Sequence, residues 1–426
     1  MMFQREAHVY VGIDIHKRSN VAVMVDCFGE AMGKPVKFDN APAAFPDWLE
    51  KVRKRASGKG IIFGLEDCHG LGRQLALFLL EQGAVVKFVN AYSTKKMRES
   101  INKSDALDAH AVAKATAEKN VRLPDADMDP LQWAMLSTVA FRKGLVQEVI
   151  RIKNRLHYLL LNNWPDYDKF FSEPFESKTA LAFWQDFPSV YRLAGVSLEE
   201  LTAYLRAQSH FAMGEKKAVV ILAAVDGSQE PAYQFQQDTL IRSSVEGLRS
   251  LQKQLADVDK QLGLLLEETD YRLTHIPGID VVMAAELVAL VGDVTRFNNV
   301  DKFMAYTGIA PTTQGTGETE TRYRSQYGRR ELNSFFYRIA TTQLVVHAKT
   351  GEPRNPEAKA YYDRLLGAEA ALPAKQRNRK VVKKALLSLM RQQAKRFYRL
   401  MKQQKCEALV RRAGAVTEAV EAPEAA

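Results

Sequence analysis

Four carboxylate residues occupy positions from which they could bind metal ions together. Asp14 lies in the apolar run VYVGIDIHKRSNVAVMV, which predicts a strand, a tight turn and a returning strand. Glu66 ends a second apolar run, GIIFGLE, and an amphipathic helix follows it. Asp105 and Asp108 are three residues apart in KSDALDAHAVAKA, so on a helix they share one face. Carboxylate oxygens suit Mg²⁺ or Mn²⁺, and two such ions can hold the attacking and leaving oxygens of a phosphodiester exchange.

The elements that carry these acids indicate an α/β domain over residues 1–125. Three early strands are followed by a helix at 44–57, a buried strand at 60–66, a helix at 71–83 and a short strand at 84–90. Strands that alternate with helices, with acids at the strand ends, place a site at the carboxyl edge of the sheet. This order of elements resembles the ribonuclease-H-like fold.

The composition is that of an ordinary globular protein, with 46% hydrophobic and 26% charged residues. The 426 residues allow two or three domains, and no apolar stretch approaches the length of a membrane span. Three cysteines without a CxxC pair, and an N-terminus without an apolar signal core, favour a reducing cytoplasm.

The net charge of +10 is concentrated in one C-terminal stretch. Residues 373–412 hold 14 lysines and arginines against a single acid, Glu407. Like charges repel along a helix, and a polyanionic partner offsets that repulsion. Lys380, Lys383 and Lys384 are therefore candidate nucleic-acid contacts, although a solvated surface helix has the same composition.

The middle of the chain, residues 126–270, has a helical pattern. Two long amphipathic stretches flank a mixed segment, and the second carries an apolar heptad series from Leu248 to Leu265. They pair as an antiparallel coiled coil within the chain, or one of them pairs between protomers. After Arg412 the low-complexity residues 413–426 are expected to be disordered.

The third region, residues 271–412, is predicted to be mainly helical and to contact nucleic acid. An apolar residue, then PGI, then a helix resembles a helix-hairpin-helix element, in which the backbone around Gly278 faces a phosphate. A stretch rich in Gly and Thr follows, and its arginines can hold phosphates: Arg322, Arg324, Arg329 and Arg330. Near the acids, Lys17 and Lys103 are further candidate phosphate contacts.

Together these motifs resemble the DEDD transposases of insertion sequences, recombinases guided by a bridging RNA. The matching pieces are VGIDIHK, GLEDCHG, KSDALDAHAVA, IPGIDVVMAAELVALVGDVTRF, YTGIAP, GTGE, SQYGRRELN and YYDRLL. No single piece is specific, but their order and spacing are. The resemblance implies a RuvC-like N-terminal domain, a coiled-coil middle and a C-terminal transposase domain with a catalytic serine.

One departure concerns the nucleophile. Where the family has Ser-Gly after GIAP, this chain has Thr316-Gly317, and a threonine hydroxyl supports the same chemistry. Ser325 is the nearest serine, but it matches a later position of the pattern, so Thr316 is preferred. Loss of strand transfer in this copy stays open. The family's Gly-Asn is here Gly328-Arg329.

The sequence therefore predicts a transposase that cuts and rejoins double-stranded DNA. Asp14, Glu66, Asp105 and Asp108 would bind Mg²⁺ or Mn²⁺, and Thr316 would attack the phosphate. The resemblance also implies that the protein binds donor DNA, target DNA and a guide RNA, and that it forms a homodimer or homotetramer. The alternatives are a RuvC-like endonuclease that uses water and a non-catalytic nucleic-acid-binding relative. A sugar kinase or ATPase would need a second phosphate loop, which the sequence lacks.

Overall fold

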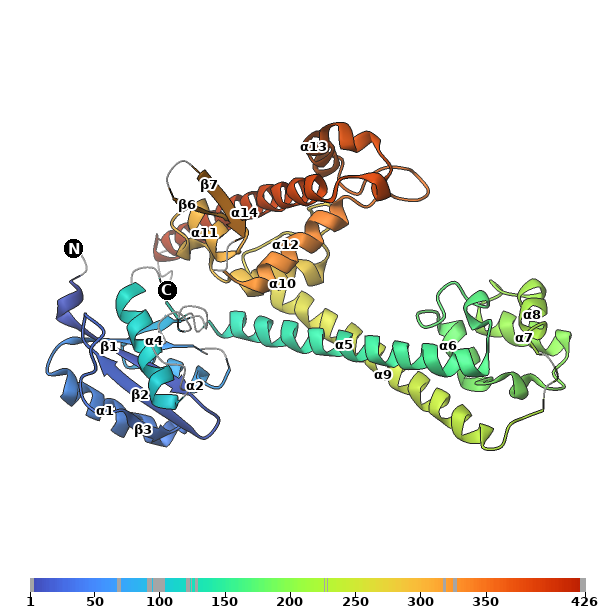
Figure 1. The fold of residues 1–426 in the computed structure, drawn as a ribbon, viewed down its shortest axis with the longest axis horizontal. Coiled ribbons are helices and arrows are strands. Elements are labelled where there is room, and N and C mark those ends of the chain that lie inside the picture. The colour runs from blue at the N-terminus through green and yellow to red at the C-terminus, as the bar shows by residue number, and fades with distance from the viewer. Residues whose placement is uncertain are drawn as a thin grey trace. The chain divides into compact units, whose positions relative to one another are not determined.

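The N-terminal segment of the computed structural model folds as a five-stranded mixed sheet (Figure 1). The strand order is β3-β2-β1-β4-β5, in which β1 pairs antiparallel with β2 and parallel with β4. This mixed sheet confirms the α/β fold that the sequence predicted. The strands are β1 (His8–Ile15), β2 (Ser19–Val25), β3 (Val36–Asp39), β4 (Gly60–Leu65) and β5 (Val85–Phe88).

The structure describes most of the chain. Outside the described residues lie 1–3, 67–69, 90–93, 95–103, 120–122, 124, 127–128, 226, 228, 317–318, 325–327 and 422–426. For residues 119, 311–316, 319–324 and 413–421 the backbone alone is described. In the described part, no helix has the length and apolarity needed to cross a membrane.

Helices cover both faces of the sheet. Successive side chains of a strand point to opposite faces, so each strand contributes to the core on either side. Val9, Val11 and Ile13 of β1 pack against α1 (Phe45–Ala56) and α2 (Arg73–Glu81). Tyr10 of β1 lies on the opposite face, against the alanines of α4 (Asp105–Lys119). The even-numbered residues of β1, including Asp14, therefore belong to the α4 face.

Gly12 sets the position of α4 on the sheet. A Cβ atom built on Gly12 would lie 2.1 Å from the Ala113 nitrogen and 2.3 Å from the Ala109 oxygen. Its parallel partner Gly64 is equally close to Thr116 of α4, at 1.9 Å from Oγ1. The backbone of α4 therefore rests directly on Gly12, and the side chain of Thr116 from the same helix rests on Gly64 of the adjacent strand.

A side chain at Gly12 is expected to push α4 off the sheet. We expect Gly12→Ala to destabilise the protein by about 3 kcal/mol or more, because backbone atoms rather than a flexible side chain must move. Gly144→Ala is the matched control, since nothing lies within 4 Å of its Cβ position in α5 (Pro130–Asn163). That change should instead stabilise the helix by up to about 1 kcal/mol. Equal shifts of the two chemical denaturation curves would contradict this role of Gly12.

A separate compact unit, residues 135–269 with 281–286, is built on two long helices. Helix α5 packs against α9 (Gln234–Glu267) through a shared apolar core. Arg142 binds Asp259, Ile152 lies beside Gly247, and Asn163 accepts a hydrogen bond from Gln234. Residues with increasing numbers along α5 contact residues with decreasing numbers along α9, so the two helices are antiparallel. Leu248, Leu251, Val258 and Leu262 of the apolar series are buried within this unit, which favours the intramolecular pairing of the two alternatives.

The segment between α5 and α9 folds as short helices around an aromatic core. Trp164, Trp184 and Phe183 are fully buried there, with the ring centroids of Phe183 and Trp184 5.1 Å apart. The elements are η4 (Tyr167–Lys169), α6 (Lys178–Asp186), η5 (Val190–Leu193), α7 (Leu198–Gln208) and α8 (Glu215–Leu222).

The C-terminal segment is mainly helical, as predicted, with one β-hairpin. Its core includes Phe303, Phe336 and Phe397, all fully buried. The elements are α10 (Val281–Val291), η6 (Val294–Arg296), α11 (Val300–Tyr306), β6 (Pro311–Thr316), β7 (Thr319–Arg324), α12 (Arg330–Gln343), α13 (Pro356–Leu366), η7 (Gly367–Ala371), η8 (Ala374–Gln376) and α14 (Arg379–Glu421).

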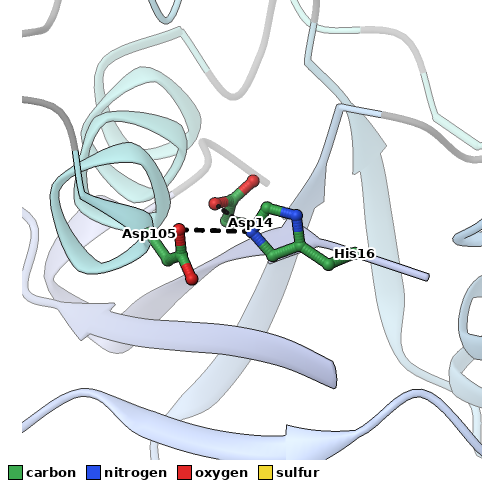
Figure 2. A group of neighbouring side chains, drawn as sticks. All are labelled: Asp14, His16 and Asp105. Carbon is green, nitrogen blue, oxygen red and sulfur yellow. Dashed lines mark ion pairs between the residues drawn. The ribbon is translucent and has the colours of Figure 1, made fainter. Parts of the chain in front are cut away.

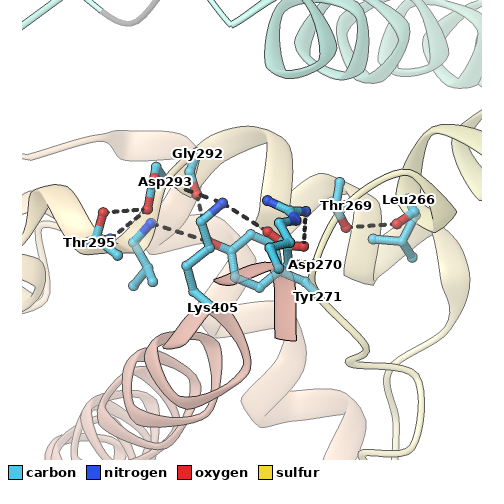
Figure 3. A network of polar contacts seen from close by, with 10 residues as sticks. Leu266, Thr269, Asp270, Tyr271, Gly292, Asp293, Thr295 and Lys405 are labelled. Carbon is cyan, nitrogen blue, oxygen red and sulfur yellow. Dashed lines mark hydrogen bonds and ion pairs between the residues drawn. The ribbon is translucent and has the colours of Figure 1, made fainter. Parts of the chain in front are cut away.

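The later part of α14 is fixed by ion pairs rather than left as a uniform basic surface (Figure 3). Asp270 accepts hydrogen bonds from Lys405 at 2.9 Å and Arg412 at 2.5 Å. Beside it, the Tyr271 hydroxyl accepts a hydrogen bond from the Val294 nitrogen, and burial raises its pKa to about 12. Part of the basic excess of this helix is therefore neutralised within the protein.

The backbone of α14 continues to Glu421, where the sequence predicted a disordered tail from residue 413. This difference has a local cause. The segment AGAVTEAVEA is rich in alanine and glutamate, which are strong helix formers.

Candidate metal and nucleic-acid site

Asp14 and Glu66 lie at one edge of the sheet because β1 and β4 are parallel. Ile13 pairs with Leu65, so the next residue of each strand, Asp14 or Glu66, emerges at the same level. Gly12 and Gly64 face α4, and side chains alternate, so the two acids also face the α4 side. The sheet thus brings together two carboxylates that are far apart in the sequence.

The contact of α4 with Gly12 places Asp105 beside Asp14. Two residues of strand, from Gly12 to Asp14, advance about 6.6 Å, and four residues of helix, from Ala109 back to Asp105, span about 6 Å. The first residue of α4 therefore arrives beside Asp14. Asp108 lies on the same helical turn, close enough for its charge to act on Asp14.

His16 lies between the two aspartates (Figure 2). Its Nε2 atom is 3.1 Å from Asp14 Oδ2 and 3.4 Å from Asp105 Oδ1. Among the described residues, one ligand atom from each of these three side chains lies within 4.8 Å of the others. Glu66 and Asp108 are not part of this close group.

The electrostatics of Asp14 are those of a partly buried acid among other acids. Burial raises the pKa of its carboxyl above the ordinary value. The nearby His16 opposes this increase, whereas the charges of Asp108 and Asp105 add to it. The site therefore favours binding of a positive charge, because a cation would relieve both the repulsion and the desolvation.

The donor set fits a divalent metal ion. Two carboxylate oxygens and an imidazole nitrogen converge from the end of β1, the loop after it and the start of α4. Asp105 and His16 are substantially exposed, with 57% and 46% of their side-chain surfaces accessible. An ion at this position would therefore keep open positions for water or phosphate oxygens.

Glu66 has a defined partner of its own. Its Oε1 atom accepts a hydrogen bond from the Thr94 hydroxyl. Thr94 is buried, so this contact orients the carboxylate at the strand end. Of the predicted phosphate contacts nearby, Lys17 is exposed in the β1–β2 loop, and Lys103 lies outside the described residues.

Thr316 is the last residue of β6, opposite Thr319 at the closed end of the β6–β7 hairpin. Arg322 and Arg324 are on β7, where they pair with Thr313 and Pro311. The structure describes the backbone alone in this hairpin, so their side-chain roles stay predictions.

Gly328 and Arg329, which follow the hairpin, contact the segment that precedes it. Gly328 packs directly on the YTGIAP segment, because a Cβ there would lie 2.4 Å from the Gly308 nitrogen. Arg329 donates hydrogen bonds from its backbone to the Tyr306 oxygen at 2.7 Å and from Nη1 to the Leu290 oxygen at 3.0 Å. Arg329 is thus engaged within the protein, and its predicted contact with nucleic acid remains untested. Arg330 is exposed at the start of α12.

The remaining predicted nucleic-acid contacts differ in their surroundings. Gly278 has a φ of +84° and lies beside Gln343 and Arg354. Lys380, Lys383 and Lys384 are exposed at the beginning of α14, far along the helix from Lys405. These lysines keep the surface position that phosphate binding requires.

From the sequence, polar packing or a contact with substrate was preferred for His16 over a role as a metal ligand. The strand–turn–strand pattern showed that His16 follows the strand of Asp14, and that proximity was the available signal. It did not show that the imidazole would turn toward Asp105, because the position of α4 depends on Gly12 and Gly64.

Comparisons with known proteins agree with the order of these motifs. Residues 11–165 match the family of IS110 DEDD transposases, described as "Transposase", and residues 270–363 match "Transposase IS116/IS110/IS902 family". The chain is 24% identical over 378 residues to the uncharacterized 44.8 kDa protein of insertion element IS116 from Streptomyces clavuligerus, covering 87% of this chain and 92% of the relative. It is 25% identical to the uncharacterized 43.6 kDa protein of IS110 from Streptomyces coelicolor, covering 85% and 89%. It is 26% identical to the transposase for insertion sequence element IS1328 from Yersinia enterocolitica, covering 61% and 64%.

Proposed function

The chain belongs to the IS110/IS116 family of insertion-sequence transposases, and from this premise we propose how it cuts and rejoins DNA. The acids Asp14, Glu66, Asp105 and Asp108 hold Mg²⁺ or Mn²⁺ at the edge of the sheet. The hydroxyl of Thr316 is the nucleophile. The observation that carries the proposal is the convergence of Asp14 and Asp105, from a strand end and a helix start, on one small polar site.

The two parts of the site have different tasks. A metal ion held by the acids would supply electrophilic stabilisation of the phosphate and of the leaving oxygen. The Thr316 oxygen forms a bond to phosphorus as the bond to one strand oxygen breaks, and the freed strand end takes up the proton. The phosphothreonine link conserves the phosphodiester energy, so a strand hydroxyl can displace threonine and rejoin the DNA.

The binding partners follow from the same proposal. Donor and target DNA are double-stranded, and a guide RNA selects them by base pairing, so the protein needs no base-reading code. Exposed cations at Lys17, Arg330 and the beginning of α14 supply sequence-independent phosphate contacts. A homodimer or homotetramer holds two duplexes, and the reaction takes place in the cytoplasm at the nucleoid.

Strand exchange with purified components tests this function. The full chain is purified with its RNA, that RNA is sequenced, and duplexes matching the element ends and the target are added with Mg²⁺. We expect joined donor–target product that is lost on chelation with EDTA and on RNase treatment, and that returns when the sequenced RNA is added back. Undiminished exchange without RNA would contradict the guide, and exchange without divalent metal would contradict the role of the acids.

A further inference from the structure

The backbone of His16 is held beside the acids by a hydrogen-bond network that includes the buried Asn20. The His16 backbone nitrogen donates to Asn20 Oδ1 at 3.3 Å, and Asn20 Nδ2 donates to Asn40 Oδ1 at 3.2 Å. Asn40 Nδ2 donates in turn to the His16 oxygen at 3.0 Å and to the Leu71 oxygen at 3.1 Å. Asn20 is fully buried, so the backbone that carries His16 is fixed from both sides.

The same network joins the two loops that leave the sheet at the acidic edge. Asn40 contacts the loop after β1 through His16 and the loop after β4 through Leu71. Asp14 is the penultimate residue of β1, and Glu66 directly follows β4. Because the loop of His16 is restrained, the position of the imidazole beside both aspartates costs little further conformational entropy.

The nitrogen that faces the acids has the spacing of a metal ligand. In an octahedral ion with bonds of about 2.1 Å, neighbouring ligand atoms are about 3 Å apart. His16 Nε2 lies 3.1 Å and 3.4 Å from one oxygen of Asp14 and one of Asp105. Nε2, the outer atom of the ring, is therefore located where a shared ion would need it (Figure 2).

We propose that Nε2 of His16 is a direct ligand of the catalytic metal, together with Asp14 and Asp105, and that it biases the site toward Mn²⁺ over Mg²⁺. This rests on the proposed function, in which these acids hold the ion. Mg²⁺ strongly prefers oxygen ligands and retains its waters, whereas Mn²⁺ accepts carboxylate and imidazole together. The site would thus differ from an all-carboxylate centre in its choice of metal.

Electron paramagnetic resonance of Mn²⁺ bound to the full-length protein tests the assignment. The probe is Mn²⁺ alone, and pulsed measurements detect coupling to a directly bound ¹⁴N nucleus. We expect this coupling in the unaltered protein, its replacement by a ¹⁵N pattern after labelling with ¹⁵N-histidine, and its loss in His16→Gln. The Kd for Mn²⁺ should rise by about tenfold or more in that variant, and the Kd for Mg²⁺ by less.

His110→Gln is the matched control. His110 is on α4 like Asp105, but its Nε2 contacts the Gly29 oxygen at 3.2 Å, away from the acids. This variant should keep both the ¹⁴N coupling and the Mn²⁺ affinity.

The outcomes separate the ligand from the metal site itself. Mn²⁺ that binds in an Asp14-dependent manner without nitrogen coupling, or with coupling that survives His16→Gln, would overturn the role of His16 and leave the proposed function intact. Absence of any Asp14-dependent binding of Mn²⁺ or Mg²⁺ would overturn both. Equal losses of Mn²⁺ and Mg²⁺ affinity in His16→Gln would refute the metal bias.

Discussion

Replacement of Asp14 by asparagine is expected to abolish DNA cleavage and, in the same molecule, to stabilise the metal-free protein. Cleavage should fall by at least roughly 10²–10³-fold, because the amide removes a charge that holds the ion at the scissile phosphate. The change is nearly isosteric, so the packing of α4 on Gly12 is kept. A cleavage assay with Mg²⁺ on element-end duplexes measures the loss.

The gain in stability follows from the raised pKa of Asp14. Burial and the neighbouring acids hold the folded-state pKa above the unfolded value, so the folded protein retains this proton more tightly. Stability is therefore lost as the pH rises through that interval, and at neutral pH the ionised carboxylate is a cost. Asparagine removes this cost. In EDTA the melting temperature of Asp14→Asn should exceed that of the unaltered protein at pH 7, and the difference should shrink as the pH falls below the ordinary range of aspartate.

An acid outside the site provides the comparison. Asp39 ends the edge strand β3 and is exposed, so Asp39→Asn should change cleavage little. A lower melting temperature for Asp14→Asn at neutral pH would show that the ionised Asp14 carboxylate stabilises the folded state, which would contradict the raised pKa of this acid.

The N-terminal fold was predictable because local patterns and tertiary packing agree there. Apolar runs identify β1 and β4, and the parallel pairing of Ile13 with Leu65 places Asp14 and Glu66 at one edge. The spacing of Asp105 from the alanines of α4 was also visible in the sequence. That this helix would rest on Gly12 was not, because a glycine in a strand has several uses and its close contact involves a distant segment.

The parts that sequence reasoning did not supply depend on long-range polar contacts. His16 reaches Asp105 only once α4 is in place. In the sequence Arg329 is one of several arginines in a basic stretch. In the structure its guanidinium donates a hydrogen bond to the Leu290 oxygen. Likewise, Lys405 and Arg412 belong to the basic run but bind Asp270. A basic composition predicts that such residues have a partner, but it does not distinguish nucleic acid from groups of the protein itself.

Removal of the Thr316 hydroxyl is expected to stop strand exchange. Thr316→Ala should lower the joined product by a factor of at least roughly 10³, because the covalent intermediate cannot form. Thr316→Ser should retain exchange or increase it, since serine keeps the hydroxyl and lacks the methyl group that crowds the attack. Thr319 faces Thr316 across the hairpin, and Thr319→Ala is the matched control that should retain exchange.

The covalent link itself distinguishes the competing mechanisms. A labelled donor strand should remain attached to the denatured protein, and mass spectrometry should locate phosphate on Thr316. In Thr316→Ala the adduct should vanish while metal binding at Asp14 persists, because Thr316 is not one of the proposed metal ligands. Exchange that survives Thr316→Ala but is lost in Ser325→Ala would move the nucleophile to Ser325. Cleavage that persists in both variants without rejoining would instead indicate water as the nucleophile, so that the acids alone would account for a hydrolytic nuclease.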